Sequence, residues 1–133
     1  MKVFLDVNIL IYAAGAPHPH KDPATRLLRR VSDGDVEAVI DAEILQELLY
    51  RYFRVQRLEE GCALVDQAVR LLPSVLPVEK SDVVLARQLL AEHRQLEPRD
   101  AVHAAIMLHH GLTRIYTYDR HFDLVPGLER LTP

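Results

Sequence analysis

Short apolar segments of strand length alternate with longer helical segments along most of this chain, and this alternation constrains the fold more than any other feature. Residues 2–5 and 37–40 are runs of strand length, and each is followed by a segment whose apolar residues recur at helical spacing. Strands that alternate with helices predict a parallel sheet with helices on both faces. We therefore expect an α/β fold: a three-layer α/β/α sandwich with a central, mainly parallel sheet of four or five strands.

Capping residues and helix breakers divide the rest of the chain. Asn8, Asp41 and either Ser81 or Asp82 are expected to cap three helices. The other expected elements are helices over 23–33, 58–72 and 98–110, a short Val-rich segment between Pro73 and Pro77, and strands over 114–118 and 129–132. Helical spacing within 58–72 aligns five apolar or weakly polar side chains, those of Leu58, Cys62, Val65, Val69 and Leu72.

Length and composition fit one globular domain over residues 1–133. The chain is 49% hydrophobic and 26% charged, can bury one sizeable core, and contains no repeat or linker. No apolar run approaches the roughly 20 residues of a membrane helix, and Asp6 interrupts any N-terminal signal segment, so we expect a cytoplasmic protein with no membrane partner. Cys62 is the sole cysteine, which excludes an intrachain disulfide and a Cys-rich metal cluster.

The charge balance leaves nucleic-acid binding open. The net charge is −3, whereas nucleic-acid binders usually neutralise phosphates with Lys and Arg. Of the 16 basic residues only three are lysine, and the planar guanidinium of arginine binds phosphate in a bidentate manner.

Acidic residues occur where ligands bind in a parallel sheet. Asp6 and Asp119 each directly follow an expected strand, and the carboxyl ends of parallel strands are where ligands bind. Asp100 lies in the first turn of its helix, and Glu47 lies among apolar residues of another. Singly, each has a structural explanation as a turn, a cap, a helix-start acid or part of a solvated stripe. Together at one edge, these carboxylates would repel one another unless a cation were bound.

Four motifs occur in order along nearly the whole chain. They read FLDVNILIYA at 4–13, ILQELLYR at 44–51, PRDAVHAAIM at 98–107 and YTYDRHFD at 116–123. In these motifs the chain resembles the PIN-domain family, and more narrowly the VapC-type toxin ribonucleases of toxin–antitoxin systems. The resemblance implies a PIN-like α/β/α sandwich and a metal-dependent endoribonuclease that hydrolyses RNA phosphodiester bonds.

The resemblance also implies a set of site residues. By motif match, Asp6, Glu47, Asp100 and Asp119 take the four acidic positions, which are both catalytic and metal-binding. Asn8 matches a polar position that holds a metal-bound water or caps a helix, and Asp123 is a further candidate metal ligand beside Asp119. The implied cofactor is Mg²⁺, with Mn²⁺ as the alternative, in one or two copies. In two-metal sites one ion lowers the pKa of a water and the other steadies the leaving oxygen.

The implied partners are an RNA substrate, a small antitoxin protein and a second copy of the chain in a homodimer. Two alternatives stay open: a PIN-domain nuclease of RNA processing that is not a toxin, and a catalytically silent PIN-fold interaction module. The intact acidic set disfavours the silent module. A haloacid-dehalogenase-type phosphatase needs a second Asp where Asn8 stands, and no P-loop motif is present.

Histidines and arginines near the motifs admit more than one role. His103 lies one turn after Asp100, which leaves open that it faces the site. For all the histidines we expect surface or capping roles rather than metal ligation. Arg51, Arg54 and Arg57 recur near helical spacing beyond Glu47. They either guide RNA phosphates, form ion pairs with nearby glutamates, or contact a protein partner.

Overall fold

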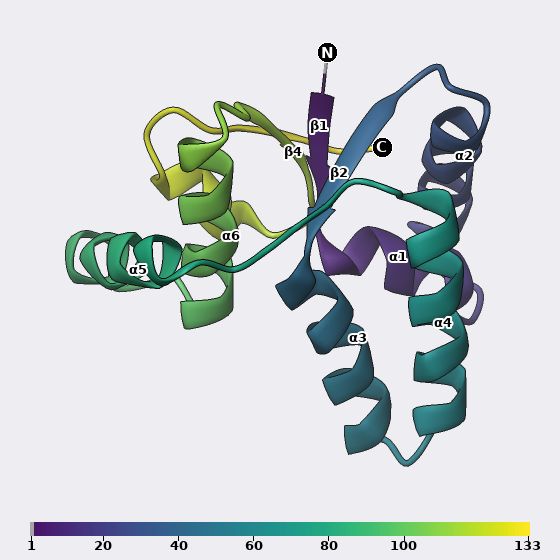
Figure 1. Ribbon diagram of the computed structural model, residues 1–133. Helices are drawn as coiled ribbons and strands as arrows, with labels where there is room; N and C mark the ends of the chain where they lie inside the picture. The colour runs from purple at the N-terminus through teal and green to yellow at the C-terminus, as the bar shows by residue number, and fades with distance from the viewer. Residues whose placement is uncertain (1) are drawn as a thin grey trace.

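A five-stranded parallel sheet runs through the centre of the computed structural model, which describes residues 2–133 (Figure 1). Its strand order is β3-β2-β1-β4-β5, and each neighbouring pair is parallel. The strands are β1 (Lys2–Leu5), β2 (Glu37–Asp41), β3 (Val75–Leu76), β4 (Arg114–Tyr116) and β5 (Glu129–Leu131). The α/β class and the parallel sheet predicted from the sequence are confirmed.

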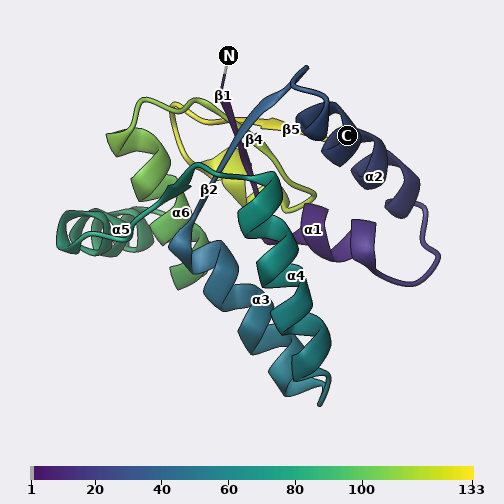
Figure 2. The same ribbon diagram turned by 45° about the vertical axis from the view of Figure 1, so that its right-hand side comes forward.

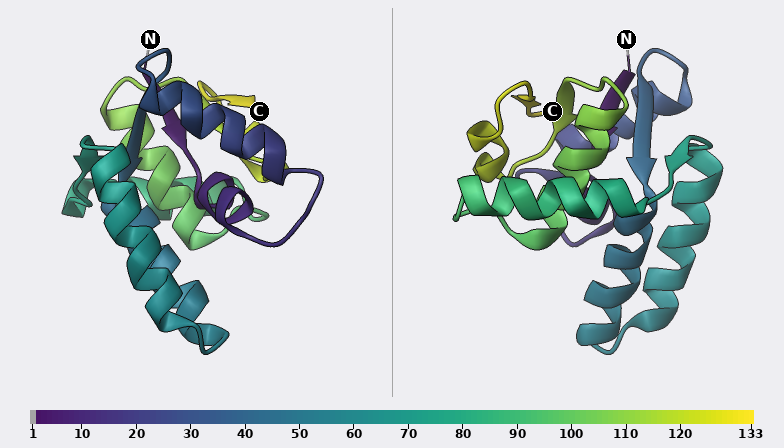
Figure 3. Two further views of the ribbon diagram at one scale, coloured as in Figure 1. Left: turned by 90° about the vertical axis from the view of Figure 1, so that its right-hand side faces the viewer. Right: turned by 60° about the vertical axis from the view of Figure 1, so that its left-hand side comes forward.

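Helices cover the sheet on both sides. Within residues 2–133 they are α1 (Val7–Ala14), α2 (Lys21–Ser32), α3 (Ala42–Arg54), α4 (Leu58–Leu71), α5 (Lys80–Glu92) and α6 (Pro98–His109), with a short 3-10 helix η1 (Arg120–Leu124). Helices α5 and α6 lie on one side of the strands, and α1, α2 and α4 lie on the other (Figures 1 and 3). The paired helices α3 and α4 extend away from the sheet as a hairpin (Figure 2). Among these described helices, none is long and apolar enough to cross a membrane.

The central strand β1 sets the register of the three strands that lead to the acidic residues. Phe4 of β1 pairs with Val39 of β2 on one side and with Ile115 of β4 on the other, and all three side chains are buried. Because the strands are parallel and in register, their carboxyl ends meet at one edge of the sheet. The residues that follow β1, β2 and β4 therefore lie close together.

Two predicted helix caps are wrong by two or three residues. Helix α1 begins at Val7, so its cap is Asp6 rather than Asn8, and an Asp6 carboxylate oxygen accepts the Val7 N–H at 2.8 Å. Helix α5 begins at Lys80, and Glu79 is its cap. Asp82 instead lies inside the first turn, where its carboxylate accepts the Glu79 N–H at 2.8 Å. Short acidic side chains can serve either position of a capping box, so sequence alone leaves the start of the helix open.

Strand β4 is shorter than predicted. The Thr117 N–H still donates to the Leu131 carbonyl at 3.0 Å, and side chains replace the backbone ladder after Thr117. The Tyr118 N–H points to the Asn8 side-chain oxygen at 3.5 Å, and the Asp119 N–H donates to the Thr117 hydroxyl at 3.0 Å. Asp119 therefore lies three residues beyond the strand rather than directly after it. These side-chain bonds turn the chain inward at the acidic edge.

Helix α4 packs only partly on the face that its apolar spacing indicates. Of the five aligned side chains, Leu72 is buried and Val65 is half-buried, whereas Leu58, Cys62 and Val69 are exposed. Gly61 and Ala68 are buried, and a Cβ at position 61 would lie 2.7 Å from the Tyr52 Cβ. Glycine at position 61 therefore allows α4 to approach α3 closely.

Replacing Gly61 by alanine should therefore destabilise the fold. Alanine favours a helix over glycine by about 1 kcal/mol, but the new Cβ meets a backbone-anchored atom and forces the helices apart at a cost of about 1–3 kcal/mol. We expect thermal unfolding of Gly61→Ala to show a Tm lowered by about 4 °C for each 1 kcal/mol of net loss. The opposite change at an exposed site of the same helix, Ala63→Gly, should lower the free energy of unfolding only by the difference in helix propensity, about 1 kcal/mol. A Gly61→Ala variant more stable than the parent would refute the close packing.

Candidate active site

Asp6 is fixed at the end of β1 by three hydrogen-bond donors. One carboxylate oxygen accepts the Val7 N–H, and the other accepts the Thr117 hydroxyl at 2.7 Å and the Asn8 amide at 3.3 Å. The Thr117 hydroxyl oxygen in turn accepts hydrogen bonds from the Asn8 amide at 3.1 Å and from the Asp119 backbone N–H. With one bond donated and two accepted, this hydroxyl makes all the hydrogen bonds that it can. Asn8 and Thr117 thus orient a carboxylate that is only 3% exposed.

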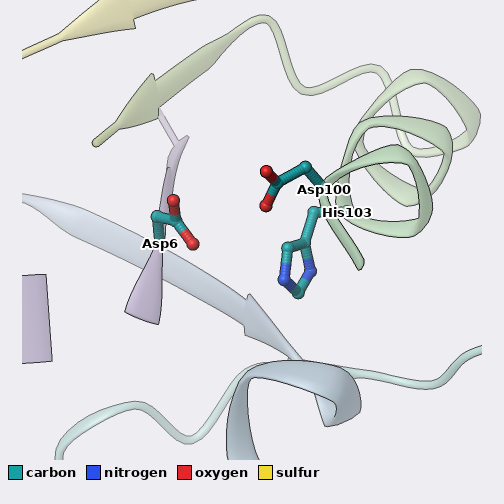
Figure 4. Close-up of side chains that lie close together, drawn as sticks. All are labelled: Asp6, Asp100 and His103. Carbon is teal, nitrogen blue, oxygen red and sulfur yellow. The ribbon is translucent and has the colours of Figure 1, made fainter. Parts of the chain in front are cut away.

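Asp100 faces Asp6 from the first turn of α6, and the two carboxylates point toward one another (Figure 4). Oxygen atoms of Asp6 and Asp100 and a ring nitrogen of His103 lie within 4.8 Å of one another. Asp100, Asp119 and His121 form a second such group. Asp100 belongs to both groups, so it joins the end of β1 to the segment after β4.

Burial and crowding make Asp100 a weak acid. Burial is the largest cause, and the negative charges of Asp6 and Asp119 add to it, raising the pKa of Asp100 to about 8. Burial also raises the pKa of the Asp6 carboxyl. At neutral pH the carboxyl groups of Asp6 and Asp100 therefore cannot both ionise without a large cost in free energy unless a positive charge is added.

His103 is fully buried between two further carboxylates. Its Nδ1 lies 2.6 Å from an Asp41 oxygen and its Nε2 lies 3.4 Å from a Glu47 oxygen. Burial acts to lower the pKa of His103, but the hydrogen bonds to Asp41 and Glu47 outweigh it and raise the pKa to about 10. The ring is therefore an imidazolium that donates from both nitrogens.

The expected surface or capping role of His103 is thus wrong. Asp41 does cap α3, since one oxygen accepts the Ile44 N–H at 3.0 Å, but its other oxygen holds His103, a role the sequence did not indicate. Thr117 was also missed. The three-residue spacing from Asp100 to His103, which puts both on one helix face, is the signal that favoured an inward His103.

Glu47 lies on α3 within reach of three positive groups. It is 4% exposed, so a place on the solvated stripe is excluded. Besides His103, its second oxygen is 3.0 Å from Arg51 and 3.6 Å from Arg99. Burial acts to raise the pKa of Glu47, but the bonds and charges of His103 and Arg51 hold it below its usual value. Glu47 is therefore ionised at neutral pH.

The structure separates the two candidates of the final motif. Asp119 caps η1, accepting the His121 N–H at 2.9 Å, and reaches Asp100. Asp123 is exposed and paired with Arg130 at 3.0 Å, and neither of the two groups around Asp100 includes it. Glu43 lies one turn before Glu47 and was not among the residues predicted for the site. Burial raises the pKa of its carboxyl group as well.

The donor set fits a hard divalent cation. Asp6, Asp100 and Asp119 offer carboxylate oxygens, which Mg²⁺ and Mn²⁺ prefer. Both ring nitrogens of His103 face carboxylates, those of Asp41 and Glu47, so the carboxylates of Asp6, Asp100 and Asp119 are the oxygen ligands best placed for such an ion.

In the absence of metal, stability should fall as the pH rises toward 8. Folded Asp100 keeps its proton up to about pH 8, whereas the unfolded chain loses it near the ordinary value of 3.8. Between these values the folded state binds more protons, so the free energy of unfolding decreases with rising pH. His103 acts in the same sense at higher pH, because its folded pKa of about 10 lies above 6.5.

The variant Asp100→Asn isolates this effect. In chelator, we expect its Tm to exceed the parent's by little at about pH 4, close to the unfolded pKa, and by at least about 10 °C at about pH 8, since one pKa unit corresponds to about 1.4 kcal/mol. Asp66→Asn, which removes an exposed carboxylate of α4, is the matched control and should show no such pH-dependent gap. Equal gaps at both pH values would contradict the raised pKa.

Metal binding should reverse the loss of stability that the crowded carboxylates cause near pH 8. A ligand that binds only the folded state raises Tm with concentration, so millimolar Mg²⁺ or Mn²⁺ should stabilise the parent and the Asp66→Asn control. Asp6→Asn and Asp100→Asn should lose most of this gain, because each removes a charged oxygen ligand. Equal stabilisation of all four proteins would place the ion elsewhere.

Comparisons with known proteins agree with this geometry. Residues 3–128 match the family described as PIN domain. The chain is 43% identical over 129 residues to the VapC ribonuclease Mb1869c of Mycobacterium bovis and to ribonuclease VapC13 of Mycobacterium tuberculosis, covering 97% of this chain and 98% of each relative.

Solved structures share the fold. The M. tuberculosis toxin VapC20, described as cleaving the sarcin–ricin loop, aligns with a TM-score of 0.78 at 21% identity over 98% of this chain and 99% of that one. A toxin–antitoxin complex from Klebsiella pneumoniae aligns with a TM-score of 0.69 at 17% identity, over 96% and 95% of the two chains. A family match over nearly the whole chain, together with relatives of this similarity, shows that the chain belongs to the PIN-domain family and, within it, to the VapC proteins.

Proposed function

We propose that this chain is a metal-dependent endoribonuclease and the toxin of a toxin–antitoxin pair. The observation that carries the proposal is the convergence of Asp6, Asp100 and Asp119 at one sheet edge, where burial and then the neighbouring negative charges raise the pKa of Asp100 to about 8. A site built this way binds a divalent cation rather than leaving its carboxylates to repel one another. The ribonuclease names of the 43% identical relatives support RNA as the substrate.

Asp6 and Asp100 are the principal ligands in this proposal, and Asp119 adds a third oxygen. Thr117 and Asn8 keep the Asp6 carboxylate in place by hydrogen bonds to one oxygen. A divalent ion held there, Mg²⁺ or Mn²⁺ in one or two copies, would supply the charge that acidifies a water and stabilises the leaving oxygen of a phosphodiester.

Glu47 serves as the acceptor that orients the attacking water. Its low pKa keeps it ionised, and His103 and Arg51 hold its two oxygens in a fixed orientation. In-line attack by water breaks the bond to the 3′ oxygen of the RNA, which leaves a 3′-hydroxyl and a 5′-phosphate. The RNA 2′-hydroxyl takes no part.

Protein partners are part of the proposal. The Klebsiella neighbour is a toxin–antitoxin complex, and apolar side chains lie exposed at the turn of the α3–α4 hairpin, where Phe53 is 63% exposed beside Val55 and Leu58. Such a surface suits a small antitoxin. Exposed Val83 and Val84 on α5 suit a second copy of the chain in a homodimer. We place the protein in the cytoplasm, where its RNA substrate is found.

The reaction is tested with single-site variants on structured RNA. The parent with Mg²⁺ or Mn²⁺ should yield fragments with 5′-phosphate ends, and chelator should abolish cleavage. Asp6→Asn and Asp100→Asn keep the side-chain shape but remove the charge that holds the cation, so cleavage should fall at least about 100-fold. Sequencing of fragment ends and gel kinetics measure both results.

Asp66→Asn is the matched control and should cleave like the parent. Cleavage in chelator, or by both Asn variants at the parental rate, would refute the mechanism. Fragments that end in a 2′,3′-cyclic phosphate would indicate attack by the RNA 2′-hydroxyl. A folded, metal-binding parent that cuts no RNA would favour the silent interaction module.

A further inference from the structure

Two elements bring arginines together beside Glu47. Arg51 and Arg54 lie on α3, and Arg99 lies in the first turn of α6 next to Asp100. Arg51 and Arg99 both approach one oxygen of Glu47, at 3.0 and 3.6 Å. The group formed by these three arginines and Tyr50, here named the arginine cluster, therefore borders the proposed catalytic carboxylates.

Tyr50 holds two of these guanidinium groups in place. Its hydroxyl oxygen accepts a hydrogen bond from Arg54 at 3.0 Å, and the Arg54 guanidinium lies over its ring, 5.8 Å from the centroid. The Arg99 guanidinium lies 5.1 Å from the same centroid. An aromatic ring attracts cations and limits their motion, so the cluster loses less conformational entropy when an anion binds.

The arginine cluster carries unbalanced positive charge. Glu47 is shared by Arg51 and Arg99, and within residues 2–133 Arg54 has no carboxylate within ion-pair distance. The side chain of Arg51 is half exposed and Arg54 is exposed, so both can reach an anion in solvent. Arg57 differs, because Glu60 binds its guanidinium through two nitrogens and neutralises it.

We propose that the arginine cluster binds the phosphate backbone of an unpaired RNA segment next to the bond that is cut. The inference rests on the proposed function, since a phosphodiester at Asp6 and Asp100 brings the adjoining phosphates past Glu47. Planar guanidinium groups bind phosphate oxygens in pairs. The segment is unpaired because Asp6 and Asp100 are 3% and 9% exposed, too recessed for a base-paired backbone to reach.

RNA is favoured over an acidic segment of a protein partner by the position of the cluster. Arg51 and Arg99 adjoin Glu47, beside which the substrate must lie, and Tyr50 links Arg54 to Arg99. The exposed apolar side chains of Phe53 and Val55, which flank Arg54 in the sequence, suit a protein partner instead. The cluster itself consists of three arginines and one tyrosine.

The test is the salt dependence of RNA binding. A fluorescently labelled single-stranded RNA is titrated in chelator, where the proposed reaction does not run, over a series of KCl concentrations. Each phosphate contact on a single strand contributes about 0.7 to the slope of log K against log salt. We expect the double variant Arg54→Gln/Arg99→Gln to lower the magnitude of the slope by about 1.4, and Arg54→Gln alone by about 0.7.

Arg57→Gln is the matched control, since it removes one arginine from the same helical hairpin but one already neutralised by Glu60. Its slope should equal the parent's. Arg54 contacts none of the carboxylates named above, so the single variant stays informative if Arg99→Gln disturbs Glu47. Circular dichroism and Tm check that each variant folds.

The outcomes separate this inference from the proposed function. If the parent cleaves RNA while Arg54→Gln and the double variant keep the parental slope, the cluster is not an RNA site, and its charge is left for a protein partner. If the slope falls as expected but the parent cuts no RNA, the cluster binds RNA and the proposed function fails. A fall of equal size in Arg57→Gln would show a general charge effect and overturn the assignment.

Discussion

The buried imidazolium of His103 connects the elements that build the acidic edge. It lies between Asp41, at the end of β2, and Glu47, on α3, and it is itself part of α6. Without this cation the fully buried Asp41 carboxylate would lose its positive partner, and Glu47 would keep only Arg51 and Arg99. A buried carboxylate left without its partner costs far more than the bridge itself. The bridge therefore sets where α3 and α6 stand relative to the sheet, and with them Glu47 and Asp100.

One buried cation does not balance the acids around it. Asp41 and Glu47 face both ring nitrogens of His103, and within residues 2–133 no second cation as buried as His103 lies beside Asp6, Asp100 and Asp119. The raised pKa of Asp100 is the physical sign of that deficit. A protein that only bound a partner would be more stable with a neutral residue in place of Asp100. The presence of this carboxylate cluster therefore favours a nuclease over a catalytically silent interaction module.

Helix α3 joins the catalytic edge to two surfaces. Its start is held by Asp41, its middle places Glu47, and its exposed face carries Tyr50 and the arginines before it ends at exposed apolar residues near Phe53. Gly61 keeps α4 close behind it. The close packing of the hairpin thus holds α4 against the helix that carries Glu47, Tyr50 and two of the three arginines.

Sequence alone was sufficient for the sheet and for most of the acidic edge. Alternating strands and helices predict parallel strands, and parallel strands end at one edge whatever their detailed packing, so Asp6 and Asp119 could be brought together without coordinates. Asp100 and Glu47 stood out as a helix-start acid and as an acid among apolar residues, the motif resemblance assigned both to the site, and the structure places them at or beside the same edge. The boundaries of β4 and the caps of α1 and α5 were displaced because local side-chain bonds decide them.

Only the tertiary structure decided the partners of these acids. His103 and Asp41 are 62 residues apart, and Thr117 and Asp6 are 111 apart, so no local pattern links them. Helix α6 is buried on most sides, at Ala101, Ala104, Ala105, Ile106 and Met107 as well as His103, and its apolar pattern therefore does not reveal which side meets α3. The sequence determined which edge of the sheet is acidic; packing determined which charges face one another there, because that depends on the rotation of each helix about its own axis.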